Sequence, residues 1–365
     1  MNERLHSMSP GPLTPGPLTL RPMALGEILD RTAQMYRAGF LRFAGIAALP
    51  MGVLLAFAAV AVGSIAWAIH SGAKDAFSYT EGVLFLVYMG AVGLVGLVLF
   101  VATLALSWAA LTEAAANTFL GGTSFTIRGM YASAAQRRWS LLWLLTMQLL
   151  FLAVIPGSAV FGMLPLNAAL AVMATRAGLS GLAAVGTVVT VVVIAALSGL
   201  ALWLLLRLCL GFAACVVEQL SAWQALKRSW ALSKGTKGRL FLIFLLGYAL
   251  EYVLTIVIYV VVAIVIALVP GLQGEKNADA MTTVVMIVFY ILTLLVRALA
   301  TPVYGIALTL AYFDQRIRKE GFDIEWMMRD AGMMSAAAAT ETPGMPAAAS
   351  PWLVLPEEPA GGTES

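Results

Sequence analysis

The sequence predicts an all-α fold class, a polytopic membrane helix bundle with six transmembrane helices. Three observations predict it. Of the 365 residues, 61% are hydrophobic and only 11% are charged, whereas an ordinary soluble domain carries about a quarter charged residues. Six apolar runs each exceed the ~20 residues that a helix needs to cross a bilayer. The basic residues gather between alternate runs, and the composition excludes an ordinary soluble enzyme.

The apolar runs define the expected spans. Several are close to ~30 residues, about 45 Å as a straight helix, so these helices must tilt or extend beyond the hydrocarbon. Pro156, Gly157 and Pro165 interrupt the third run, where we expect a kink or a break. The six runs are residues 40–70, 83–111, 140–173, 182–217, 240–269 and 282–313.

The distribution of Lys and Arg predicts the orientation of the chain. Roughly seventeen basic residues lie before the first span, after the sixth, and in the loops that follow the second and fourth spans. The three other loops hold one each: Lys74, Arg176 and Lys276. By the positive-inside rule, both termini are expected in the cytoplasm.

The two ends of the chain differ from the membrane region, which we assign to residues 23–330. Residues 1–22 are rich in Pro and Gly and contain no apolar h-region, so we expect a disordered leader and no cleavable signal peptide. Residues 331–365 are rich in Ala and Pro and cannot bury enough apolar surface to order themselves. We expect a disordered tail there.

An amphipathic segment of about ten to fifteen residues, too short and too charged to cross, precedes each odd-numbered span. In the third segment, Trp223, Leu226 and Trp230 form an apolar stripe, with Lys227 and Arg228 turned away. This layout predicts three units of a surface helix followed by a hairpin of two spans. The alternative is three cytoplasmic loops with helical propensity. The units cover about residues 24–120, 121–218 and 219–330.

Three ionisable residues, Arg207, Glu251 and Arg297, fall within the expected spans. A charge at mid-membrane costs at least ~2.5–3.5 kcal/mol, so each should find a partner. Glu251 and Arg297 are expected at similar depth, because their spans fold back through one loop. We expect Glu251 to pair with Arg297, with Arg207 or with both. A structural clamp and a path for substrate or protons both remain open.

Residues that carry catalysis or hold cofactors are scarce. The only histidines are His6 and His70, and no metal-binding, phosphate-binding or dinucleotide motif occurs in its proper setting. Cys209 and Cys215 point to different helix faces, which excludes a metal site or a disulfide between them. We therefore expect no enzyme activity and no cofactor. The small net charge of +3, spread over short clusters, argues against a nucleic-acid partner.

Three separated segments, residues 21–31, 225–235 and 312–323, carry a resemblance. Their order and composition resemble a bacterial multi-pass family labelled glycerophosphoryl diester phosphodiesterase membrane domain. The resemblance implies a six-span module of the bacterial inner (plasma) membrane. It implies no phosphodiesterase activity, because the sequence lacks the catalytic domain that gives the family its label.

The second and third of these segments contain basic and aromatic residues suited to a headgroup layer. The alternative is positive-inside anchoring alone. The candidate headgroup contacts are Lys227, Arg228, Trp230, Arg316, Arg318 and Lys319.

We expect a non-enzymatic module that interacts with lipid or organises a membrane protein partner. Its expected partners are the phospholipid bilayer, with its anionic headgroups, and a membrane protein. The alternative function is a small transporter or channel for an anionic or lipid-like solute, using Arg207, Glu251 and Arg297. An intramembrane enzyme is the least favoured class.

Overall fold

The computed structural model describes residues 21–70, 79–122, 125–176, 180–268 and 278–330. Within these ranges the chain forms eleven helices and no strand, which confirms the all-α fold class. Residues 1–20 of the expected leader and the whole expected tail, 331–365, lie outside the described ranges.

Short and long helices follow one another in the expected order, with two further short helices at Gly211–Val217 and Phe322–Asp330. A short helix comes before two long ones in each third of the chain, although the equivalence of the three units stays a prediction. The elements are α1 (Leu25–Ala38), α2 (Phe40–His70), α3 (Tyr79–Phe119), α4 (Ile127–Gln136), α5 (Arg138–Arg176), α6 (Ser180–Leu208), α7 (Gly211–Val217), α8 (Ala222–Leu232), α9 (Lys237–Leu268), α10 (Ala278–Glu320) and α11 (Phe322–Asp330).

Five helical segments are long and apolar enough to cross a membrane, judged by length and composition. For α5, only Arg138–Leu152 qualifies as an apolar segment, so the sixth span and the orientation of the termini stay predictions. The five segments are Phe40–Ala68, Thr80–Phe119, Ala184–Val217, Lys237–Val265 and Val284–Glu320. We expected a kink or a break at Pro156 and Pro165; α5 is one continuous helix there, so the chain does not break, and the kink stays a prediction.

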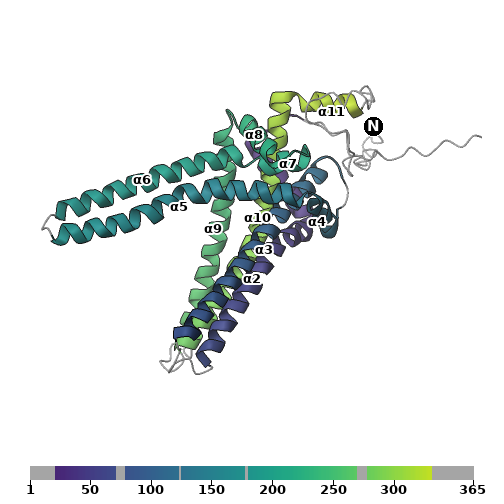
Figure 1. Ribbon diagram of the computed structural model, residues 1–365. Helices are drawn as coiled ribbons and strands as arrows, with labels where there is room; N and C mark the ends of the chain where they lie inside the picture. The colour runs from purple at the N-terminus through teal and green to yellow at the C-terminus, as the bar shows by residue number, and fades with distance from the viewer. Residues whose placement is uncertain (1–20, 71–78, 123–124, 177–179, 269–277, 331–365) are drawn as a thin grey trace, which may run out of the picture.

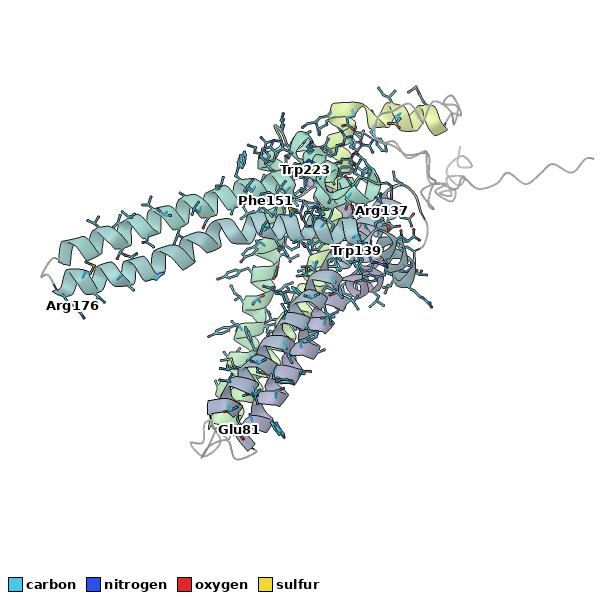
Figure 2. The ribbon with its side chains drawn as sticks, viewed as in Figure 1. Glu81, Arg137, Trp139, Phe151, Arg176 and Trp223 are labelled. Carbon is cyan, nitrogen blue, oxygen red and sulfur yellow. The ribbon has the colours of Figure 1, made fainter. Side chains whose placement is uncertain are left out.

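The long helices form two arms that meet at one end (Figure 1). Helices α2, α3, α9 and α10 run side by side, with α10 in contact with the other three. The α5–α6 hairpin leaves this group as a separate arm. Glu81 and Arg176 mark the two far ends (Figure 2). The short helices α4, α7 and α8 gather where the arms meet, a region that we call the junction.

The buried core lies at the junction. Its largest fully buried side chains include Phe43, Leu111, Leu144 and Tyr312. Away from the junction the arms expose many large apolar side chains, as expected for helices that face lipid. The packing that holds the two arms together is therefore concentrated at one end of the molecule.

A proline inside α2 explains one contact at this end. Pro50 has no N–H to donate to the carbonyl of Ile46, four residues earlier. Two hydroxyls donate to that oxygen instead, Tyr131 at 2.5 Å and Ser107 at 3.1 Å. Burial raises the pKa of Tyr131 above its ordinary value, so its hydroxyl remains a donor. The short helix α4 is thereby tied to α2.

The short helices α1 and α8 make similar contacts. The Tyr36 hydroxyl of α1 donates to the carbonyl of Leu299 at 2.8 Å, beside the carbonyl that Pro302 leaves unpaired in α10. The Ser229 hydroxyl of α8 donates at 2.8 Å to the carbonyl of Arg207 in the last turn of α6. Each of these three helices, α1, α4 and α8, therefore donates to a backbone oxygen of a long helix from a different third of the chain.

We predict that the hydroxyl of Tyr131 compensates for Pro50. Tyr131→Phe should lower the free energy of unfolding by about 1 kcal/mol, because a buried carbonyl loses a donor. In a Pro50→Ala background the restored N–H takes over that carbonyl, and the same substitution should cost almost nothing. Thermal unfolding of the four proteins in detergent measures both differences. Equal losses in the two backgrounds would contradict the assignment.

Candidate lipid site at the junction

Four charged side chains form a balanced cluster, and one of them is Glu218, which directly follows α7. Arg228 Nε lies 2.8 Å from a Glu218 oxygen, and Arg228 Nη1 lies 2.6 Å from Glu320 Oε1. Arg316 Nε lies 3.3 Å from Glu320 and 3.6 Å from Glu218, and the Tyr312 hydroxyl donates to Glu218. Two carboxylates thus face two guanidinium groups.

The cluster keeps Arg228 charged. Burial lowers the pKa of this guanidinium, but the hydrogen bond to Glu320 and the negative charge of Glu218 outweigh burial and raise the pKa above its ordinary value. Because both carboxylates already neutralise Arg228 and Arg316, neither arginine offers an unpaired charge to a lipid phosphate.

A second buried carboxylate ties the two ends of the membrane region together. Asp314, whose side chain is 1% exposed, accepts the Met23 N–H at 2.8 Å and Arg318 Nε at 2.9 Å. Arg239 Nη1 lies 3.3 Å from the same carboxylate. Arg318 also donates to the carbonyl of Met23 at 2.7 Å, so the segment before α1 is held at both its N–H and its C=O.

Lys319 caps a helix. Its ammonium group donates to the carbonyls of Leu232 and Lys234, each at 2.7 Å, where α8 ends. A cation at this position satisfies carbonyls that have no partner within the helix and favours the negative end of the helix dipole. Lys319 is therefore committed to the backbone of α8.

Four of the six candidate headgroup residues have partners within the protein, and their contact with lipid stays a prediction. Arg228, Arg316 and Arg318 pair with carboxylates, and Lys319 binds carbonyl oxygens. The sequence could have indicated these ion pairs, because the carboxylates Glu218, Asp314 and Glu320 lie in or beside the same segments as the basic residues. Lys227 and Trp230 are the two candidates whose side chains bind no carboxylate or carbonyl among the described residues.

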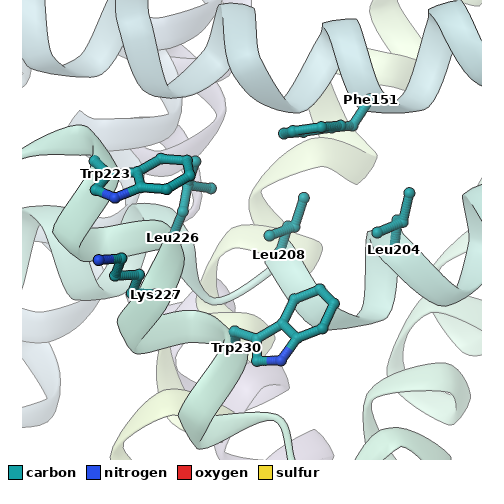
Figure 3. A pocket seen from close by; sticks show the side chains of 7 residues that line it. All are labelled: Phe151, Leu204, Leu208, Trp223, Leu226, Lys227 and Trp230. Carbon is teal, nitrogen blue, oxygen red and sulfur yellow. The ribbon is translucent and has the colours of Figure 1, made fainter.

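Lys227 and Trp230 line a pocket of about 340 Å³. Figure 3 shows α8 on one side, with Leu204 and Leu208 of α6 and Phe151 of α5 opposite. The volume falls in the range of roughly 300–1,000 Å³ usual for ligand sites. The full lining is Phe151, Leu204, Leu208, Trp223, Leu226, Lys227 and Trp230.

The sequence of α8 explains how this wall forms. Ser221 and Gln224 make a capping box that starts the helix. Trp223, Leu226 and Trp230 follow at helical spacing, and the apolar stripe that they were expected to form faces the hairpin. Lys227 was expected to turn away with the polar face but lies at the pocket instead.

Three cations at the junction contact tryptophan rings and form no ion pair with any described residue. Lys227 Nζ lies 5.6 Å from the centre of the Trp223 ring. The Arg207 guanidinium lies 4.7 Å from the Trp230 ring and 5.4 Å from the Trp203 ring, and Lys237 lies 5.0 Å from the latter. Such contacts stabilise cations only modestly. We call Arg207, Lys227 and Lys237 the tryptophan-bound cations.

Arg207 is held at the junction rather than beside Glu251. One terminal nitrogen donates to the carbonyl of Trp230 at 3.1 Å, while its buried Nε has no acceptor among the described residues. Glu251 instead lies 3.2 Å from Arg297 Nε, the pairing that the sequence predicts between these two residues. The expected alternative, in which Arg207 also pairs with Glu251, is wrong.

Comparisons with known proteins add no relative: no family model, no curated protein and no solved structure matches the chain. The family resemblance described above therefore stays a prediction that depends on its three sequence segments. Within the described residues, no group of three or more His, Cys, Asp or Glu side chains could hold a metal ion.

We predict that Asp314 holds the start of the membrane region in place. Asp314→Ala should lower the free energy of unfolding by about 2 kcal/mol, below the usual cost of breaking a buried pair because both arginines reach solvent. Amide hydrogen exchange should also rise around Met23. Asp30→Ala is the matched control, since the exposed Asp30 accepts only from Gln34 on its own helix. Equal effects of the two substitutions would refute the role of Asp314.

Proposed function

We propose that this protein is a non-enzymatic module of the bacterial inner membrane that binds an anionic phospholipid at the junction. An acyl chain occupies the pocket between α5, α6 and α8, and the phosphate binds the tryptophan-bound cations. The observation that carries the proposal is the position of an apolar pocket beside cations that no described carboxylate neutralises.

The apolar part of the proposal depends on the pocket lining. Six of its seven residues are Leu, Phe or Trp, and Lys227 is the exception. A pocket with almost no hydrogen-bonding groups suits a hydrocarbon chain better than a polar solute, because polar groups lose hydrogen bonds on entering it. Tryptophan is also the residue type that favours the layer between hydrocarbon and headgroups.

The charged part depends on the contrast between two groups of basic residues. Arg228, Arg316 and Arg318 face carboxylates at 2.6–3.3 Å, whereas the tryptophan-bound cations face aromatic rings. Each basic residue near an anionic membrane surface contributes about 1 kcal/mol. The positive-inside rule puts the junction at the cytoplasmic leaflet, where such lipids interact with basic segments.

The transporter alternative receives less support from this geometry. It required Arg207, Glu251 and Arg297 to converge on one path, but Arg207 contacts Trp203 and Trp230 while the other two residues pair in the α9–α10 region. The part of the proposal that says the module is non-enzymatic is supported by the sequence alone, in which we recognise no set of catalytic residues.

We predict selective retention of anionic lipid. Native mass spectrometry of protein extracted from nanodiscs of equal phosphatidylglycerol and phosphatidylcholine should show phosphatidylglycerol enriched. Lys227→Ala should weaken this binding roughly fivefold, and adding Lys237→Ala roughly thirtyfold, since each cation contributes about 1 kcal/mol. Arg128→Ala is the matched control, because Arg128 is an exposed cation on the surface of α4.

A further variant distinguishes the contribution of the pocket to lipid binding from that of the charged residues. Leu204→Trp fills the pocket and should weaken retention of both lipids, whereas the lysine variants should affect only the anionic one. Equal retention of the two lipids by the unaltered protein would refute the proposal. So would a loss on Arg128→Ala as large as that on Lys227→Ala.

A further inference from the structure

An ion pair lies halfway along a membrane-spanning segment. Glu251 is the central residue of the apolar segment Lys237–Val265 of α9, and it pairs with Arg297 of α10 at 3.2 Å. Even so, the side chains of Arg297 and Glu251 are 56% and 23% exposed. Hydrocarbon offers no hydrogen-bond acceptor, so a charge left facing it is costly. Something other than lipid tails must cover this face.

The guanidinium of Arg297 is only partly satisfied. It carries five N–H donors, and the contact with Glu251 is made through Nε. No described residue accepts a hydrogen bond from its terminal nitrogens. A second carboxylate is the acceptor that best fits the planar geometry of a guanidinium group.

Among the described residues, Glu251 is the one carboxylate at this depth. In α3, Glu81 lies near the start and Glu113 near the end, where Glu113 accepts from Ser133. In α10, Asp314 and Glu320 belong to the junction. The sequence of α5 and α6 contains no Asp or Glu. Neither arm of the same molecule can therefore offer Arg297 another carboxylate at mid-membrane.

We infer that the face of α9 and α10 that carries Glu251 and Arg297 is the interface with a second copy of this chain. Two copies in one membrane share an orientation, so a two-fold axis along the membrane normal brings residues of equal depth together. The two-fold rotation reverses the order of Glu251 and Arg297 in the second copy. Arg297 of each copy therefore faces Glu251 of the other. Four alternating charges result, and each guanidinium gains its missing acceptor.

The rest of this face suits such an interface. Tyr248, Tyr252 and Tyr259 are exposed and lie along one flank of α9, next to Glu251 in helical projection. Their rings supply a large contact area, and their hydroxyls can bond across a dry interface. α9 and α10 present the face as one unit, because a Cβ added to Gly247 would overlap the ring of Tyr304.

A charge exchange between copies tests this inference independently of the lipid site. Glu251→Arg gives a chain with two arginines on the face, and Arg297→Glu gives a chain with two glutamates. Each alone should dimerise at least roughly tenfold more weakly than the unaltered protein in liposomes, as measured by single-molecule photobleaching. Mixed in two colours, the variants should form heterodimers. Failure to recover association on mixing, with both variants folded, overturns the inference.

Cross-linking provides a second measurement if those variants do not fold. Tyr252→Cys should form a dimer disulfide in a Cys209→Ala, Cys215→Ala background. Leu97→Cys, on a similarly exposed position of α3, is the control and should not. A monomeric unaltered protein overturns the inference, and so does cross-linking of Leu97→Cys with none at Tyr252→Cys. Stoichiometric co-purification of a different membrane protein that protects Tyr252→Cys from a thiol reagent also overturns it.

Discussion

Two buried carboxylates, Asp314 and Glu218, fix the junction on which the rest of the structure depends. Asp314 joins α10 to α9 and to the segment before α1, and Glu218 joins α7 to α8 and α10. The two arms diverge from this end, so their relative placement is decided there (Figure 1). Apolar contact alone discriminates little between helices in lipid, whereas these polar contacts specify both partner and register.

The same carboxylates divide the basic residues into two groups. Those beside Asp314 and Glu218 serve the fold, because their charge is neutralised within the protein. Arg207, Lys227 and Lys237 contact tryptophan rings and form no ion pair with a described residue, and Lys227 lines an apolar pocket. The proposed binding of an anionic lipid depends on the basic residues that the folding contacts leave without a carboxylate partner.

Local patterns predicted most of the fold, and tertiary contacts decided most of the site. Helix length, the apolar stripe of α8 and the Glu251–Arg297 pairing follow from spacing along one or two helices. The partner of Arg207 could not be predicted from spacing, because α6 ends at Leu208 and the fold then places the Arg207 side chain against Trp230 of α8. Likewise, no spacing rule shows that Arg228 reaches both Glu218 and Glu320, which lie on different helices.

Electron cryo-microscopy of the protein in nanodiscs that contain phosphatidylglycerol tests the central claim most directly. The account predicts an elongated density between Phe151, Leu208 and Trp230, ending in a headgroup beside Lys227 and Arg207. A pocket that is empty at a resolution where neighbouring annular lipids are visible, or one filled by the protein's own side chains, would contradict it.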